Sequence, residues 1–342
     1  MRMKSVISLA LLLCGALVSC VRRQLEDPDF GTTLNVNVNI SAIANVSCKV
    51  YNSKIPLPQI NPEVMRVLFY DIHRDRLVAE SFISDVVTDP EGKMSVRGNL
   101  SILPGDYRMI IYQFGTESTQ IDRYESYDNA NAYTGALSEE ALRALQLRSG
   151  SAFDGQTIRY QPDHIIAARS EHESIPYHAG VYTITAEASS LVESYYLQVK
   201  VNGLQWVSSA KAVLSSMVPS VNLSTLEKDC ENPCAIYTPL LKSDDNGTPV
   251  VCNVFNTFGR VPDSTNKLEV TFELQTIDGK MLKKSYDISD LFESKECIEN
   301  HWLLIEDTIE VPEPDDPHPG GGGGLFDPVV DDWEEEHHEI EL

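Results

Sequence analysis

The heptapeptide LNVNVNI, residues 34–40, alternates apolar and asparagine side chains without a break. A period of two places Leu34, Val36, Val38 and Ile40 on one face and the asparagines on the other, which is typical of a strand with one buried face. Similar short runs predict further strands at 65–70, 77–87, 94–102, 107–114, 181–188, 195–201, 206–217, 250–255, 268–274, 281–282 and 302–311. The sequence is therefore dominated by the strand period.

Turn-forming residues separate these runs. Residues 103–106 read Leu-Pro-Gly-Asp, and Asp278-Gly279 is the strongest short hairpin signal in the chain. One segment instead predicts a short amphipathic helix. Ser138 is suited to cap it and precedes two glutamates, and the apolar residues of its one face are Leu137, Ala141, Leu142 and Leu145. Many short strands with one short helix predict an antiparallel all-β sandwich or barrel.

The chain is long enough for two domains, since domains typically hold about 100–200 residues. Periodicity weakens between 149 and 176, which we take as the junction. We expect five parts, namely a signal peptide (1–19), a polar tether (20–31), a first β-sandwich that contains the helix (32–172), a second β-sandwich (173–312) and a tail (313–342).

The first twenty residues predict export and lipid attachment. Arg2 and Lys4 precede an apolar run, residues 6–13, that is too short to cross about 30 Å of hydrocarbon. The run leads to Leu17-Val18-Ser19-Cys20, which fits the bacterial lipobox, where the cysteine thiol takes a diacylglycerol. Several acyl chains, palmitate among them, give near-permanent membrane attachment, since each buried methylene contributes about 0.8 kcal/mol. The alternative is an ordinary signal peptide that contains a cysteine.

The charge balance excludes several classes of partner. There are 27 Lys and Arg against 51 Asp and Glu, a net charge of -24, so we expect no nucleic-acid partner and no basic patch for anionic lipid. Residues 306–342 hold 14 acids and no Lys or Arg, with a Pro-rich spacer at 313–319 and five glycines at 320–324. The tail also contains Val330, Trp333, Ile340 and Leu342, which favour either a strand that docks on another surface or a disordered end.

The sequence holds no recognisable catalytic constellation. It lacks the common hydrolase, metalloprotease and nucleotide-binding motifs, so we predict no enzyme activity, no catalytic residue and no cofactor. We predict no metal site either, because His337-His338 in an acidic tail and the turn at 243–247 are both typical of solvated segments. Cys48, Cys230, Cys234, Cys252 and Cys297 are scattered and odd in number, so they do not form a disulfide framework.

Several stretches resemble fimbrillin-associated anchor and assembly lipoproteins of the Bacteroidetes. In the first half they are NPEVMRVLFY at 61–70 and LPGDYRMIIY at 103–112, and in the second LEVTF at 268–272. The glycines at 320–324, followed by FDPVVDDW at 326–333, are also similar. The resemblance implies two transthyretin-like Greek-key β-sandwiches, a lipidated cysteine in the outer membrane, on its periplasmic or its outer face, and fimbrial subunits as partners in anchoring or assembling type V fimbriae.

In this family, stalk subunits become polymerisable when a protease, often Arg-specific, removes the first strand and opens a groove for a neighbour's strand. Between Gln24 and Met65 the present chain has no arginine, so we expect the first strand, Leu34 to Ile40, to stay in place. The tail from Val329 to Leu342 would then be offered to an adjacent subunit. The strand candidates for partner contact are therefore Leu34, Val36, Val38, Ile40, Val330, Trp333, Ile340 and Leu342.

Two other functions remain open from the sequence. A fimbrial tip or stalk subunit would have the same domains. A surface glycan-binding lipoprotein also fits, with Trp206, Trp333, Tyr124, Tyr127 and Tyr133 as candidates for stacking on sugar rings, although buried or loop aromatics explain most of them equally well.

Overall fold

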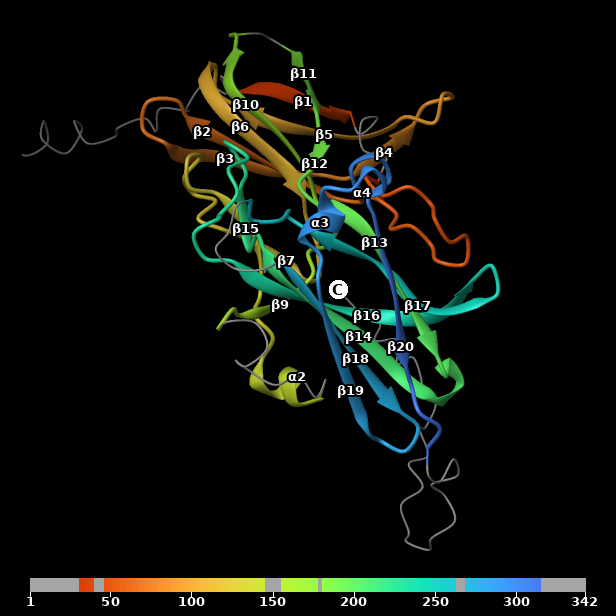
Figure 1. Ribbon diagram of the computed structural model, residues 1–342. Helices are drawn as coiled ribbons and strands as arrows, with labels where there is room; N and C mark the ends of the chain where they lie inside the picture. Colours follow the sequence, from red (N-terminus) through yellow and green to blue (C-terminus); the bar gives the residue numbers. More distant parts are fainter. Residues whose placement is uncertain (1–30, 40–45, 145–154, 178–179, 263–267, 315–342) are drawn as a thin grey trace, which may run out of the picture.

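The computed structural model describes residues 31–39, 46–144, 155–177, 180–262 and 268–314 (Figure 1). Cys20, the tether and the tail from residue 315 onward lie outside the described residues. The described chain is mostly strand with a few short helices, which confirms the predicted all-β class with two successive β-sandwiches.

The first sandwich consists of a four-stranded and a five-stranded sheet. The four-stranded sheet has the order β11 (Val181–Glu187), β1 (Thr32–Asn39), β5 (Met94–Ile102) and β4 (Asp85–Thr88). The five-stranded sheet has the order β12 (Ser189–Ser190), β10 (Ile166–Ile175), β6 (Gly105–Gln113), β2 (Met65–Asp71) and β3 (Arg76–Ile83). Leu34 and Val36 from the first sheet share a buried core with Val67, Phe69 and Met109 from the second.

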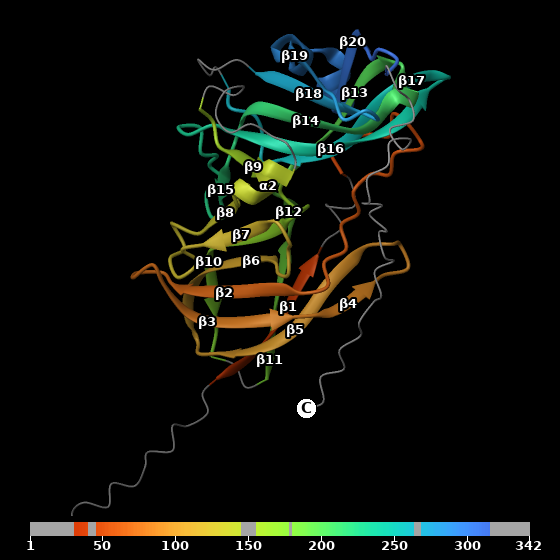
Figure 2. The same cartoon turned by 90° about the horizontal axis from the view of Figure 1, so that it is seen from below.

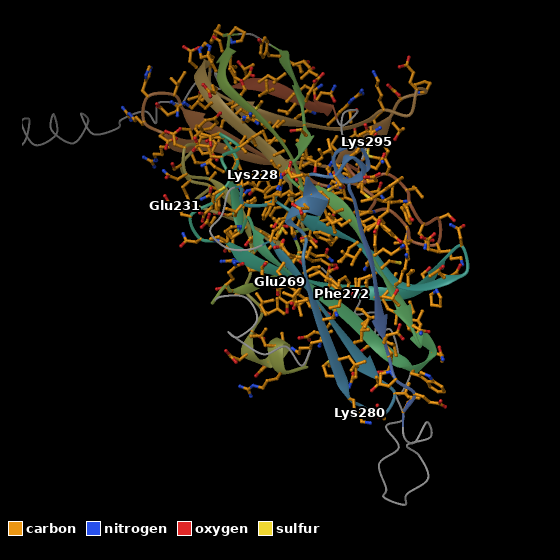
Figure 3. The ribbon with its side chains drawn as sticks, in the orientation of Figure 1. Lys228, Glu231, Glu269, Phe272, Lys280 and Lys295 are labelled. Carbon is orange, nitrogen blue, oxygen red and sulfur yellow. The ribbon has the colours of Figure 1, made fainter. Side chains whose placement is uncertain are left out.

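The second sandwich is one folded-over sheet. Its order is β19 (Met281–Asp287), β18 (Glu269–Thr276), β14 (Val207–Met217), β16 (Cys234–Asp245), β17 (Thr248–Thr257), β13 (Glu193–Asn202) and β20 (Trp302–Glu310). The long strand β16 pairs with β14 through its first half and with β17 through its second half, so it is shared by both layers. Phe272 is fully buried in the core, whereas Lys280 lies at the tip of the β18–β19 hairpin (Figure 3). The predicted Asp278-Gly279 turn is confirmed, with Gly279 at φ 81°.

Short elements join the two sandwiches. A three-stranded sheet, β15 (Ser220–Asn222), β8 (Asn131–Thr134) and β7 (Thr119–Asp122), lies between them together with β9 (Ile158–Tyr160), which pairs with β16 (Figure 2). The remaining elements are α2 (Glu139–Ala144), the 3₁₀ helix η1 (Leu204–Trp206), α3 (Ser289–Phe292) and α4 (Lys295–Asn300). A buried cluster at the junction combines Tyr70 and Ile110 of the first sandwich with Val218, Leu223 and Phe258 from the second half of the chain. One buried cluster therefore joins the two sandwiches through these short elements.

The chain between β1 and β2 crosses to the second sandwich before it returns. Cys48 and Ile55 are buried there against Tyr196 and Val250. The Lys49 amide donates to the Asn300 carbonyl at 3.0 Å, and the Trp302 indole donates to the Lys49 carbonyl at 2.8 Å. We call residues 46–57 the crossover clip, because this part of the β1–β2 connection is held against the second sandwich.

The predicted helix forms but packs elsewhere than expected. The Ala141 amide donates to the Ser138 hydroxyl at 3.1 Å, as a capping serine requires. We expected the helix to belong to the first sandwich, but Leu137 and Leu142 pack on Val213 and Ala235 of the second sandwich. The reason is that β9, which follows the helix, pairs in parallel with β16 and holds this part of the chain against that sheet.

Strand pairing also bears on the domain boundary. Residue 172, the predicted end of the first domain, falls inside β10, and β11 pairs with β1 of the first sandwich. We propose that the two domains divide near residue 191, after β12, because every strand from β13 to β20 except β15 lies in the large sheet of the second sandwich.

Candidate functional site: the groove that holds the first strand

Strand β1 lies between two neighbours rather than at an edge. It pairs in antiparallel fashion with β5, from Thr32 opposite Ile102 to Asn39 opposite Ser95. On its other side it pairs in parallel with β11, from Thr33 opposite Val181 onward. Both backbone edges of β1 are therefore hydrogen-bonded, and removal of the strand would leave an open groove between β5 and β11.

The described part of the apolar face of β1 is buried. Leu34 and Val36 are each 0% exposed, as the period-two pattern predicts. Complete burial of such side chains contributes about 1.5–3 kcal/mol each. The groove thus provides pockets for alternate side chains in addition to backbone hydrogen bonds, which is the combination used in β-strand addition.

A glycine shapes the floor of the groove. Gly98 of β5 lies opposite Val36, and a Cβ at position 98 would collide with the side chain of Ile83. Ile83 is 1% exposed and packs in the same core as Leu34. Only glycine lets β5 approach β3 this closely while it still pairs with β1.

The strand that fills the groove carries no charged residue. Residues 31–39 read GTTLNVNVN, so backbone pairing and apolar burial hold the strand. The Thr32 hydroxyl adds one bond by donating to the Pro176 carbonyl at 3.3 Å. Because no ion pair is involved, we expect salt to have little effect on the retention of β1.

The structure describes only some of the predicted site residues. Val38 stays in register, opposite Val96 and Ala186, but its side chain lies outside the described residues. Ile40, Cys20 and the tail candidates Val330, Trp333, Ile340 and Leu342 lie outside them as well. The structure therefore brings together Leu34 and Val36 alone.

The point where the tail begins is well fixed. The Val311 amide donates to the Asn202 carbonyl at 2.9 Å and Val311 is 6% exposed. Gly203, at φ 84°, lies against the Val311 carbonyl, where any Cβ would collide. β20 runs away from the first sandwich, so β1 and the end of β20 lie at opposite ends of the molecule (Figure 1).

The thiols of the described residues are free and mostly buried. Cys48, Cys234, Cys252 and Cys297 are buried and Cys230 is exposed. Burial raises the pKa of Cys48 and of Cys234 to about 12, and that of Cys297 to about 11. Such thiols are almost wholly protonated at neutral pH and are poor nucleophiles.

Other predicted features have ordinary structural explanations. Within the described ranges, no group of three His, Cys, Asp or Glu side chains could hold a metal ion, and none of the helices has the length and apolar character needed to cross a membrane. Among the aromatic candidates, Tyr127 is 3% exposed, Trp206 packs on the second core, and the Tyr124 ring lies 4.0 Å from the Arg66 guanidinium carbon.

Comparison with known proteins agrees with the resemblance predicted from the sequence. The chain is 24% identical over 302 residues to the "Putative fimbrium anchoring subunit Fim4B" of Bacteroides ovatus, covering 80% of this chain and 82% of that protein. A crystal structure of a "putative adhesin" from Bacteroides ovatus has a TM-score of 0.57 and 19% identity, covering 87% of this chain and 98% of that one. The "fimbrial anchor protein Mfa2" from Porphyromonas gingivalis has a TM-score of 0.44 and 11% identity, with coverages of 82% and 90%.

A protein-family model, DUF5119, described as a domain of unknown function, matches residues 42–237. The match begins just after β1 and ends within β16, so it takes in most of the first sandwich, the junction and part of the second sandwich. It spans more than half of the 342 residues. The chain therefore belongs to the DUF5119 family.

Proposed function

We propose that this protein is a non-catalytic lipoprotein of the outer membrane that anchors or helps to assemble fimbriae. Its first strand stays in its own groove, and its C-terminal segment is offered as a strand to a neighbouring subunit. The likeness to a protein named as a fimbrium anchoring subunit supports this function. Lipid at Cys20 would supply the membrane attachment.

The observation that carries the proposal is the double pairing of β1. A subunit whose groove already holds its own strand has no place for a neighbour's strand. Such a subunit can end a row of strand-linked subunits but cannot continue it in that direction. An anchor needs this property, because one of its sides must face the membrane.

The positions of the two ends support the same function. The tether precedes β1, and the tail follows β20 at the opposite end of the molecule. The tail would reach beyond the second sandwich on its glycine spacer, residues 320–324. The buried cluster and the crossover clip that join the two sandwiches would then transmit force between membrane and fimbria.

Deletion of residues 320–342 tests the role of the tail. Fimbrial subunits should co-purify with the intact chain from cell-envelope extracts, as identified by mass spectrometry, and should be lost from the deletion variant. A full-length variant with Val330→Asp and Trp333→Asp should lose them too, whereas Glu334→Gln with Glu335→Gln should retain them. Unchanged capture by the deletion variant would exclude the tail as the donor.

Metabolic labelling tests the lipid attachment. Labelled palmitate should enter the wild-type chain and the control Cys14→Ala, which changes only the signal peptide. It should not enter Cys20→Ala, which should leave the membrane fraction. A labelled Cys20→Ala chain, or a wild-type chain that is soluble and unlabelled, would contradict the anchoring mechanism.

A further inference from the structure

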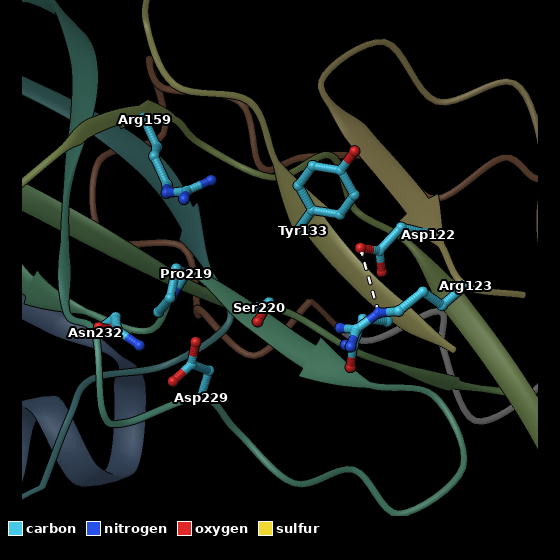
Figure 4. A pocket seen from close by; sticks show the side chains of 9 residues that line it. Asp122, Arg123, Tyr133, Arg159, Pro219, Ser220, Asp229 and Asn232 are labelled. Carbon is cyan, nitrogen blue, oxygen red and sulfur yellow. Dashed lines mark ion pairs between the residues drawn. The ribbon is translucent and has the colours of Figure 1, made fainter. Parts of the chain in front are cut away.

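A polar cleft of about 360 Å³ lies where the three-stranded sheet meets the second sandwich (Figure 4). Asp122 and Arg123 line it from the end of β7, Tyr133 from β8 and Arg159 from β9. Asp229 closes it from the segment between β15 and β16. The walls therefore come from four separate parts of the chain, and the cleft lies away from the β1 groove.

Two buried polar atoms in this cleft have no hydrogen-bond partner among the described residues. Arg159 donates through Nη1 to the Thr134 carbonyl, which leaves its buried Nε unpaired. Asp122 has one carboxylate oxygen 3.6 Å from the Arg123 Nε, and its buried Oδ1 is unpaired. Buried polar groups are nearly always paired in folded proteins, since each unpaired one costs about 1–3 kcal/mol. Both atoms are covered by protein, so a bound molecule would instead meet the accessible parts of the lining side chains, with guanidinium groups as donors and carboxylates as acceptors.

The charges in the cleft balance. Arg123 and Arg159 oppose Asp122 and Asp229, so the lining favours a neutral ligand that both donates and accepts hydrogen bonds. Figure 4 shows Arg159 and Asp229 on one side and Asp122 and Arg123 on the other, with the Tyr133 ring beside the space between them. An anion would meet two carboxylates, and a cation would meet two guanidinium groups.

The backbone at the cleft is also in an unusual conformation. Arg123 has φ 49°, a left-handed value that a residue with a side chain adopts at a cost of about 1–3 kcal/mol. This conformation follows the last residue of β7, and Arg123 is exposed there beside Asp122. Strain of this kind concentrates at ligand sites.

We propose that this cleft binds a neutral sugar unit of a glycan. Sugar hydroxyls both donate and accept, which matches guanidinium donors and carboxylate acceptors on facing walls. A sugar ring also presents an apolar face of C–H groups, which suits the Tyr133 ring. The volume lies in the range of small-ligand pockets, about 300–1,000 Å³. The site adds recognition of carbohydrate to the fimbrial function and does not depend on it.

Saturation-transfer NMR on the full chain tests the proposal. The probes are the methyl glycosides of glucose, galactose, mannose and N-acetylglucosamine, with glucuronate and sulfate as anionic competitors. At least one glycoside should receive saturation at its ring protons. Arg159→Gln and Asp229→Asn should each weaken its binding by about tenfold or more, as loss of a hydrogen bond to a charged group implies, while Arg97→Gln on β5 should leave it unchanged.

Every outcome decides the question. No transfer to any glycoside would overturn the proposal and leave a hydrated cleft. Displacement of the glycoside by glucuronate or sulfate through the same residues would assign the cleft to an anion instead. Because Arg159→Gln removes a contact to Thr134, the exposed substitution Arg123→Gln provides a second test, with thermal melting to verify that each variant is folded. Loss of fimbrial-subunit capture after tail deletion is independent of all these results.

Discussion

Substitution of Leu34 by alanine should loosen the first strand strongly. Leu34 is fully buried between the two sheets of the first sandwich, so the change removes three carbon atoms from a closed core. Buried Leu→Ala changes cost 2–5 kcal/mol, and the complete burial here places the expected loss at about 3 kcal/mol. That loss corresponds to roughly a hundredfold larger equilibrium constant for opening, since 1.4 kcal/mol is a factor of ten.

The neighbouring residue provides the control. Thr33 lies in the same strand and pairs with the same two neighbours, but its side chain is exposed, so Thr33→Ala should cost less than about 0.5 kcal/mol. Native-state hydrogen exchange measures the effect locally. Amides of β5 and β11 that bond to β1 should exchange about a hundredfold faster in Leu34→Ala and at the wild-type rate in Thr33→Ala. Equal exchange in both variants would refute the conclusion that side-chain burial retains β1 in its groove.

Three further predictions concern stability. Gly98→Val should destabilise the first sandwich by more than about 2 kcal/mol in urea unfolding, because its Cβ collides with Ile83, whereas Gly135→Ala, which has open space around it, should be nearly neutral. Burial raises the pKa of Cys234 from 9.0 to about 12, so the contribution of this thiol to stability is complete below pH 9 and is lost as the pH rises toward 12. Cys234→Ala should therefore flatten the alkaline decline in unfolding free energy, and a decline identical to that of the wild type would contradict this. Burial lowers the pKa of His164 below 6.5, so the contribution of this side chain to stability is present above pH 6.5 and is lost as the pH falls. His164→Gln should therefore weaken the loss of unfolding free energy in acid, and a steeper loss would contradict this direction of the pKa shift.

The sequence predicts the long strands of the fold well and the short ones poorly. Residues 34–40 and 268–274 show enough alternation to predict strands with one buried face, and the structure has β1 at Thr32–Asn39 and β18 at Glu269–Thr276. β7, β8, β9 and β15 have three or four residues each, too few to show a period, and they form because partners distant in sequence pair with them. The strand β10 is missed because its second half, with Glu171, His172 and Glu173, is polar and largely exposed.

One missed hairpin had a readable signal. Asn246-Gly247 joins β16 to β17, with φ of 51° and 87° at the two residues. Both positions need left-handed backbone, which Asn and Gly adopt most easily, so it was wrong to rank Asp278-Gly279 as the strongest hairpin signal, because Asn246-Gly247 is equally strong. The sequence analysis recognises the turn at 243–247 and predicts a strand after it, at 250–255, but it predicts no strand before it, so β16 and the hairpin are missed.

The candidate sites differ in how far sequence can reach them. Alternation alone identifies the buried face of β1. Local pattern also predicts the strand at 181–188, but it cannot predict that this strand, β11, pairs with β1. The polar cleft is still less accessible, because Asp122, Arg159 and Asp229 come from distant segments and each is unremarkable in its own surroundings. Of the residues that line the cleft, only Tyr133 is among the sequence candidates for contact with sugar.

The pairing of β1 also constrains how the protein can fold. Among the described strands this one is synthesised first, yet the parallel partner of Thr33 is Val181, which is 148 positions later in the chain. Contacts so distant in sequence form slowly, and an apolar strand that waits for them exposes both of its edges. A nascent chain would therefore need chaperone protection of its leading segment until β11 has emerged, and impaired chaperone supply should cause aggregation that begins at residues 34–40.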